Sequence, residues 1–189
     1  MRYGNSYETL LIPQTLISKT FNKLVNEKFQ MTTGKTLSST NKTKRNSNVT
    51  FIDEQIILKE FLDITKNVNI KAGWNFDIDT IEPLQYGEYN ELQEYGWHVD
   101  QHNNPYSDNR VRKISFSVFL NDDYTGGEFD LEIHGPLTPI SDKTRYKTFS
   151  NLPINTILFF QSDYWHRVRP VTNGVRKSIV GWVLGPKFR

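Results

Sequence analysis

Two histidines and one aspartate stand at positions where they could hold a metal ion. His98 and Asp100 are two residues apart, and His166 lies far downstream in the sequence. On an extended strand the side chains at i and i+2 point to the same face, so His98 and Asp100 can contact one ion from one side. Two imidazoles and one carboxylate that leave other coordination positions open are typical of non-haem Fe(II) centres. The pattern therefore predicts an iron site formed by His98, Asp100 and His166.

A cationic residue follows the third of these side chains. Arg176 is ten positions after His166 and, by the period of two, shares one strand face with Ser178. The planar fork of an arginine can bind a carboxylate through two hydrogen bonds, and a nearby hydroxyl adds a neutral one. An isolated arginine is most simply explained by a surface salt bridge. Its place after a predicted ligand favours a site for a carboxylate co-substrate instead.

The chain has four histidines, and two of them are not needed for this site. We interpret His102 and His134 as structural or surface residues. His102 lies close enough to His98 in the sequence to be an alternative ligand, and this alternative stays open.

Two amphipathic helices are predicted before the first ligand motif. After Pro13, a favourable first helical position, apolar residues recur at a spacing of about 3.6 and predict a helix over residues 14–28. A second periodic set follows Asp53, which can cap a helix N-terminus, and predicts a helix over residues 54–66. The polar segment 32–48 between them is predicted to be a surface loop, with a lid or substrate-binding arm as the functional alternative.

From about residue 70 onward, the hydrophobic pattern changes to a period of two. Strand-like segments lie near residues 114–120, 129–133, 144–149, 154–160 and 176–184. Many short strands after a helical section predict a mostly β protein with N-terminal supporting helices and a double-stranded β-helix, a cupin-like jelly roll. We expect a single domain over residues 1–189, with helical support and a flexible loop in 1–70 and the jelly-roll core in 71–189.

Composition limits the classes of protein to consider. The 189 residues are 37% hydrophobic and 13% aromatic, enough for a globular core. The absence of cysteine excludes disulfides, zinc-thiolate sites and iron–sulfur clusters. Neither a signal-peptide pattern nor a run of about eighteen apolar residues is present, so we expect a cytoplasmic protein without a membrane partner. The net charge of +2 is too small to indicate nucleic acid by itself.

Several motifs in this order resemble one branch of a known enzyme superfamily. They are the segment 98–100, the strand 112–121, the turn 124–129 and the segment 166–178, and the similarity covers about residues 80–185. Together they resemble the prolyl 4-hydroxylase-like branch of the 2-oxoglutarate- and Fe(II)-dependent dioxygenases.

The resemblance implies a role for each motif residue. His98, Asp100 and His166 would bind Fe(II), and Arg176, assisted by Ser178, would bind the distal carboxylate of 2-oxoglutarate. O2 would be the second co-substrate and ascorbate a supporting reductant. Succinate and CO2 would be the co-products.

The resemblance also implies a tyrosine, on the strand before the His-x-Asp motif, that hydrogen-bonds the co-substrate. Tyr86, Tyr89 and Tyr95 all precede that motif, and we select Tyr86 while the other two stay open. Some oxygen-sensing relatives have a tyrosine at the position of Phe119 that binds the distal carboxylate. Phenylalanine cannot do so, and Arg176 would therefore carry more of the anchoring.

The predicted reaction is hydroxylation of a prolyl residue in a peptide, or of free proline. Asp100 favours hydroxylation, because halogenating relatives lack this carboxylate. One alternative is a nucleic-acid or other small-molecule oxygenase of the same superfamily, for which the basic segment 42–45 could be offered in support. Nucleic-acid demethylases typically have a second arginine six residues after the first, where this chain has Trp182. A second alternative is a non-catalytic jelly-roll binding module.

The substrate itself is only partly constrained. The polar segments 32–48 and 102–111 are predicted to border the substrate, and their basic residues to select acidic flanking sequence. The sequence leaves the primary substrate, the regiochemistry and the oligomeric state open.

Overall fold

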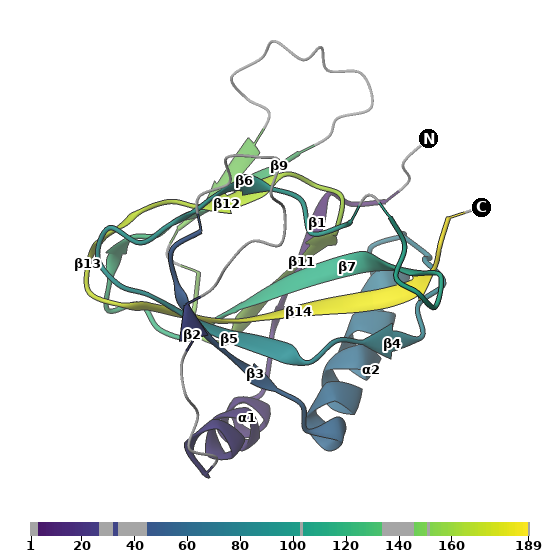
Figure 1. Cartoon of the computed structure of the whole chain (residues 1–189), viewed down its shortest axis with the longest axis horizontal. Coiled ribbons are helices and arrows are strands. Elements are labelled where there is room, and N and C mark those ends of the chain that lie inside the picture. The colour runs from purple at the N-terminus through teal and green to yellow at the C-terminus, as the bar shows by residue number, and fades with distance from the viewer. Residues whose placement is uncertain are drawn as a thin grey trace.

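Two antiparallel sheets face each other in the computed structural model, and two helices cover the outer face of the larger sheet (Figure 1). The structure describes residues 4–26, 32–33, 45–102, 104–133, 146–150 and 152–188.

The larger sheet contributes one wall of the space between the sheets. Its strands are β1 (Tyr7–Leu11), β2 (Thr32–Thr33), β3 (Asn48–Ile52), β4 (Thr80–Ile81), β5 (Leu84–Tyr89), β7 (Arg110–Phe119), β11 (Thr156–Gln161) and β14 (Arg176–Pro186). Their order is β1-β11-β7-β14-β5-β3-β2, with β4 paired to the end of β14. The two longest strands, β7 and β14, lie side by side at the centre of this sheet.

The smaller sheet forms the opposite wall. Its strands are β6 (Tyr95–His98), β9 (Phe129–Glu132), β10 (Tyr146–Phe149) and β12 (His166–Val168), in the order β10-β9-β12-β6. A third, two-stranded sheet joins β8 (Thr125–Gly126) to β13 (Val171–Asn173). The two facing antiparallel sheets confirm the predicted jelly roll.

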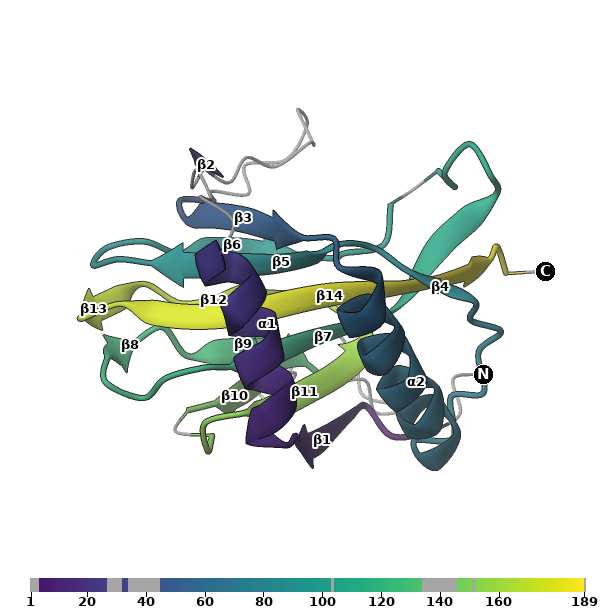
Figure 2. The same cartoon turned by 90° about the horizontal axis from the view of Figure 1, so that it is seen from below.

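Helices α1 (Gln14–Asn26) and α2 (Gln55–Lys71) lie across the outer face of the larger sheet (Figure 2). Both occupy the regions that the 3.6-residue periodicity predicts, and residues 27–28 lie outside the described residues. Neither helix in the described part of the chain is long and apolar enough to cross a membrane.

The predicted limits of α2 are wrong at both ends. Glu54, not Asp53, is its N-cap residue, and the Asp53 carboxylate instead accepts a hydrogen bond from the side chain of Gln55. The helix also continues five residues past position 66 to Lys71. Its last turns are stabilised because Asn69 is buried and its side chain bonds both the N–H and the C=O of Phe76.

The N-terminal third is more than helical support. β1 forms one edge of the larger sheet by pairing with β11, and β3 pairs with β5 inside it. The residues of β1 show no alternation of buried and exposed positions, so a period-two search cannot find this strand. Thr32 and Thr33, at the start of the predicted loop, pair with β3. Residues 34–44 of that loop lie outside the described residues.

The side chains of the central strands point alternately to the two faces of the larger sheet, so one face packs under the helices and the other faces the smaller sheet. On β14, Ile179 and Val183 belong to the core between sheet and helices, whereas Arg176 and Ser178 have the opposite parity and face the smaller sheet. The helix-side core includes a parallel stack of Phe61 on Phe116, with ring centroids 5.3 Å apart. The larger sheet therefore presents Arg176 and Ser178 to the space between the sheets, beside apolar residues such as Phe119.

Gly181 on β14 generates a test of this packing. It pairs with Phe116, and a Cβ at Gly181 would lie 2.1 Å from the Phe116 ring. We expect Gly181→Ala to lower the free energy of unfolding by about 1–3 kcal/mol through overpacking, as measured by urea denaturation. The control is Gly87→Ala on β5, whose Cβ would approach no atom closer than 3.9 Å and should change stability by less than about 0.5 kcal/mol. Equal effects of the two substitutions would contradict this account.

Candidate metal and co-substrate site

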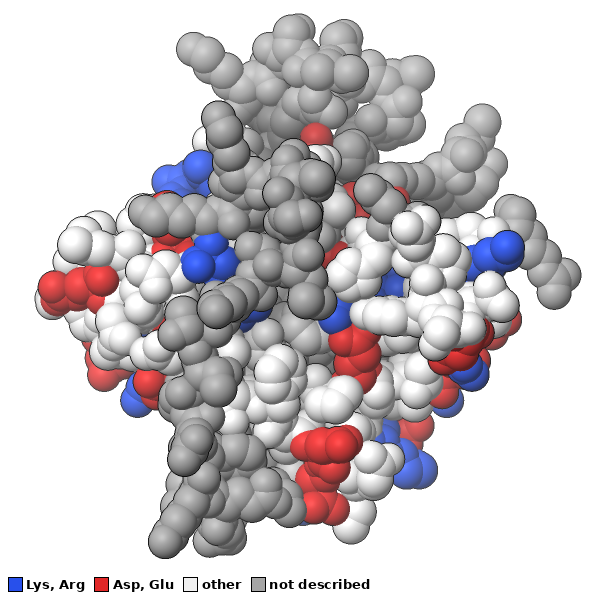
Figure 3. Space-filling model, in the orientation of Figure 1, with Lys and Arg blue, Asp and Glu red and all other residues white. Residues whose placement is uncertain are grey.

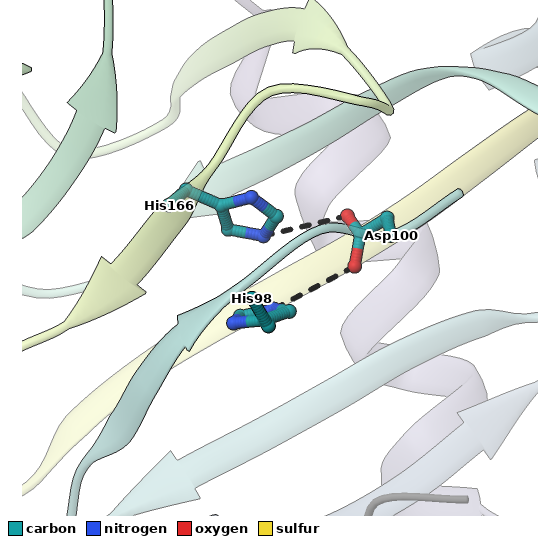
Figure 4. A group of neighbouring side chains, drawn as sticks. All are labelled: His98, Asp100 and His166. Carbon is teal, nitrogen blue, oxygen red and sulfur yellow. Dashed lines mark ion pairs between the residues drawn. The ribbon is translucent and has the colours of Figure 1, made fainter. Parts of the chain in front are cut away.

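Three side chains converge between the two sheets (Figure 4). His98 on β6 and His166 on β12 are direct cross-strand partners, with ring centroids 4.0 Å apart. The Asp100 carboxylate approaches both rings, with Oδ1 3.6 Å from His98 Nε2 and Oδ2 3.5 Å from His166 Nε2. Each residue offers one ligand atom, and these atoms all lie within 4.8 Å of one another. The structure thus brings together the three residues that the sequence selects.

Asp100 reaches this cluster from a bend and not from a strand. β6 ends at His98, two residues earlier. The backbone N–H groups of Asp100 and Gln101 both donate to the C=O of Ser162, at 2.9 Å each. These bonds fix the direction of the carboxylate. His98 and Asp100 therefore point to the same side, as the sequence predicts, but a hydrogen-bonded bend and not a continuous strand places Asp100 there.

Backbone carbonyls orient both imidazoles. His98 Nδ1 lies 2.9 Å from the C=O of Gly96, and His166 Nδ1 lies 3.0 Å from the C=O of Tyr164. A carbonyl can only accept, so each Nδ1 carries the hydrogen and donates it. The Nε2 lone pairs then remain for a metal ion, which is the usual arrangement of a ligating histidine.

The pKa values of His98 and Asp100 favour the protonation states that bind a cation. Burial and the neighbouring His166 lower the pKa of His98 to about 3, so its ring is neutral near pH 7. Burial raises the pKa of Asp100, but the adjacent His166, His98 and Arg112 outweigh this effect and lower it to about 2. Neutral imidazoles and an ionised carboxylate are the protonation states that bind metal.

The donor set and one unsatisfied atom fit a divalent ion. Within the described residues, Asp100 Oδ2 is buried and accepts no hydrogen bond. A buried ionised oxygen without a donor is costly, and a cation compensates it. Two imidazole nitrogens with one carboxylate suit a first-row metal such as Fe(II).

Arg176 is a buried cation with spare donors. Its side chain is 1% exposed, and its Nη1 donates to Ser178 Oγ at 3.0 Å. The guanidinium carbon lies 5.6 Å from the ring centroid of Tyr89 and 5.4 Å from that of Phe119. Nε and Nη2 are buried and have no hydrogen-bond partner among the described residues. Two free donors on one guanidinium match the two oxygens of a carboxylate.

Two glycines lie close to the side chains of Arg176 and Ser178. Gly127 has φ +64°, and a Cβ there would lie 3.0 Å from Arg176 Cδ, so the turn that follows β8 needs glycine in this position. Gly87 pairs with Ser178 on the neighbouring strand, and the nearest atoms to a Cβ there would lie 3.9 Å away, among them Ser178 Oγ. A side chain as small as alanine would therefore fit at this position beside Ser178.

The structure places Tyr86 away from this space. Tyr86 belongs to the core between the larger sheet and the helices, and its hydroxyl donates to Glu88 at 2.7 Å. Tyr89 has the opposite parity, pairs with Arg176 and packs in the core between the sheets. The selection of Tyr86 is therefore not supported by its position. The parity of the tyrosines alone could not decide between them, because the register of β5 against β14 is not visible in the sequence.

Tyr95 and His102 complete the surroundings of the cluster. Tyr95 stacks on His98 with ring centroids 3.5 Å apart and an angle of 15°. The His102 ring contacts Tyr106, at 5.6 Å between centroids. Where the structure describes the chain, the group of side chains that could hold a metal does not include His102. His134 lies outside the described residues.

Solved structures share this fold at low sequence identity. A Pseudomonas putida prolyl-4-hydroxylase superposes with a TM-score of 0.66 and 14% identity, over 97% of this chain and 94% of that one. A Trichoplax adhaerens prolyl hydroxylase, solved with a hypoxia inducible factor peptide fragment, gives 0.67 and 17%, over 95% and 83%. A viral collagen prolyl hydroxylase from Paramecium bursaria Chlorella virus-1, solved with 2-oxoglutarate, gives 0.66 and 15%, over 96% and 97%.

Relatives found by sequence have a higher identity to this chain, but the matched region covers only about half of it. A PKHD-type hydroxylase of Synechococcus sp. (strain CC9902) is 40% identical over 91 residues, which are 47% of this chain and 35% of the relative. A PKHD-type hydroxylase of Gloeothece citriformis (strain PCC 7424) is 37% identical over 106 residues, or 54% and 43%. The matched region is less than half the length of each of these relatives.

A family model extends across the site. The model described as the 2OG-Fe(II) oxygenase superfamily matches residues 84–184. This range runs from β5 to β14 and contains the three clustered side chains together with Arg176. Because the match covers more than half of the chain and spans the whole site, the chain belongs to the 2OG-Fe(II) oxygenase superfamily.

Proposed function

We propose that this protein is a hydroxylase that uses Fe(II), 2-oxoglutarate and O2 to hydroxylate a prolyl residue in a peptide, or free proline. The observation that carries the proposal is a buried arginine with two free donors, Arg176, in the same inter-sheet space as the His98, Asp100 and His166 cluster. The superfamily implies the iron and the co-substrates. The names of the relatives, PKHD-type hydroxylases and prolyl hydroxylases, support the reaction and the substrate class.

The three clustered residues would hold the iron. When bound, Fe(II) with 2-oxoglutarate and O2 would supply the oxidising chemistry that places one oxygen atom of O2 on carbon as a hydroxyl group and the other in succinate, with release of CO2. Asp100 contributes one negative charge, and the two histidines contribute neutral donors fixed by their carbonyl bonds. Retention of Asp100 supports hydroxylation over halogenation.

Arg176 would bind the distal carboxylate of 2-oxoglutarate through Nε and Nη2, with Ser178 holding its third nitrogen in place. Phe119 packs against this guanidinium without adding a donor, so the arginine carries the anchoring. We propose Tyr89 in place of Tyr86 as the tyrosine beside the co-substrate, because it faces the same space.

Apolar side chains keep water from the back of the cluster. Phe160 lies 4.7 Å and Phe129 5.5 Å from the His166 ring, measured between centroids. Both rings belong to the core between the sheets. The chain thereby holds His166 in one orientation and lowers the local dielectric around the metal position.

A nucleic-acid substrate has less support. Blue and red side chains are interspersed on the described surface of the face in Figure 3, and they form no broad basic area there. Trp182 occupies the position where demethylases typically have their second arginine, and the Arg112 guanidinium lies 4.0 Å above its ring. We therefore retain nucleic acid only as a control substrate.

The reaction is tested by mass spectrometry on proline-containing peptides and free proline, incubated with enzyme, Fe(II), 2-oxoglutarate and ascorbate. We expect a gain of one oxygen on proline and stoichiometric succinate. His166→Ala should abolish both and weaken metal binding by more than about a hundredfold, since even outer-shell partners of metal ligands contribute about ten- to hundredfold. Oxygen-dependent demethylation of a methylated oligonucleotide without any prolyl product would overturn the proposal.

The role of Arg176 is tested by Arg176→Met. Without 2-oxoglutarate, we expect the free energy of unfolding to stay the same or rise by about 1–3 kcal/mol, because a buried, incompletely paired charge is removed. Affinity for 2-oxoglutarate should fall by about ten- to more than a hundredfold, with little change in metal affinity. Calorimetric titration and thermal unfolding measure these effects.

Arg112→Met is the matched control for that substitution. Arg112 donates to both oxygens of Glu82, at 2.8 and 2.5 Å, so its removal should destabilise the protein even without ligand. A destabilisation by Arg176→Met equal to that of Arg112→Met, with unchanged 2-oxoglutarate affinity, would show that Arg176 is structural.

A further inference from the structure

Arg45 is the second arginine beside the site that lacks a carboxylate partner. Among the described arginines, four are paired with acidic side chains: Arg110 with Asp79 and Asp108, Arg112 with Glu82, and Arg167 and Arg169 with Asp130. Arg176 and Arg45 are the exceptions within the described ranges. Arg176 is proposed to bind the co-substrate, whereas the positive charge of Arg45 has no role in that proposal.

The backbone fixes Arg45 at the edge of the smaller sheet. Arg45 forms an isolated antiparallel bridge with Tyr95, the first residue of β6. The N–H of the next residue, Asn46, donates to the C=O of Glu94 at 3.0 Å. The Asn46 side chain accepts a further bond from Gln93 at 3.3 Å. The position of Arg45 is therefore set by main-chain pairing and does not depend on its side chain.

The Arg45 side chain extends over the ring of Tyr95, which lies beside the predicted metal ligand His98. The guanidinium carbon lies 4.9 Å from the centroid of the Tyr95 ring, and Tyr95 in turn stacks on His98 at 3.5 Å. We name this layered arrangement of Arg45, Tyr95 and His98 the rim stack. Its outer end is a half-buried cation whose Nε donates a hydrogen bond to Ser47 Oγ, at 3.1 Å. Its two terminal nitrogens form no hydrogen bond with the described residues.

We propose that Arg45 binds a carboxylate of the primary substrate and thereby selects acidic substrates. This inference rests on the proposed function. A guanidinium that is partly withdrawn from water and stacked on an aromatic ring loses less freedom on binding than a mobile lysine, and it recognises planar carboxylates through two bonds. The carboxylate can come from an Asp or Glu side chain that flanks the hydroxylated proline, or from free proline itself.

The test compares substrates that differ only in this charge. One pair of prolyl peptides has Glu or Gln next to proline, and a second pair is free proline and prolinamide. We expect the wild type to prefer the acidic member of one pair in kcat/KM by about ten- to a hundredfold, mainly through KM. In Arg45→Gln this ratio should fall toward one. Arg45→Glu should instead favour a peptide with Lys in the flanking position.

Lys59→Gln is the charge-matched control. Lys59 is an exposed residue of α2, on the helical side of the larger sheet, and pairs with Asp63. The Lys59→Gln substitution removes one positive charge, as Arg45→Gln does, and should keep the wild-type preference for the acidic substrate. This control separates binding at Arg45 from an effect of the net charge of the protein.

The possible outcomes separate the two proposals. Dependence of the preference on Arg45 in the peptide pair or in the proline pair supports the inference and identifies the source of the carboxylate. Turnover of prolyl substrates without preference, or a preference that Arg45→Gln retains, overturns the inference and leaves the proposed function standing. No turnover of any prolyl substrate by the wild type overturns both. Titration of the wild type with Fe(II) and 2-oxoglutarate shows separately whether the metal and co-substrate site is intact.

Discussion

A carboxylate and a guanidinium are buried in the same inter-sheet space, and neither is neutralised by a direct bond to the other in the described structure. Asp100 and Arg176 are 7% and 1% exposed, and each retains buried atoms without a hydrogen-bond partner. Such groups are expensive in a protein interior, and the surrounding fold must supply the free energy that holds them there. The helix-covered core, centred on Phe61 and Phe116, provides that stability at a distance from the chemistry.

The strand geometry explains how one sheet serves both tasks. Successive residues of a strand face opposite sides, so β14 places Ile179 and Val183 under the helices and Arg176 and Ser178 between the sheets. A glycine gives the larger sheet its close packing, because a Cβ at Gly181 would lie 2.1 Å from the Phe116 ring. The packing under the helices thus depends on the absence of a Cβ at this position of β14.

The sequence predicts the elements with a regular hydrophobic period and the residues whose types and spacing suit a metal site. The spacing of His98, Asp100 and His166, and the later Arg176, suffices to find the cluster and the buried arginine between the sheets. The strands β1 and β3 escape prediction because edge pairing and long-range partners, not local alternation, create them. The selection of Tyr86, which its position does not support, depends on the same kind of information. Which face of a short strand is inside depends on its register against a partner far along the chain.

The direct pairing of His98 with His166 has a consequence for folding. These residues lie far apart in the sequence, so their contact forms only after β6 and β12 have aligned, and such non-local pairing is slow. A slip of one residue would turn one imidazole toward the solvent face and divide the cluster. An ion that binds only the aligned strands therefore stabilises the correct register against its neighbours. Metal affinity in this protein is then also a measure of how accurately the smaller sheet has assembled.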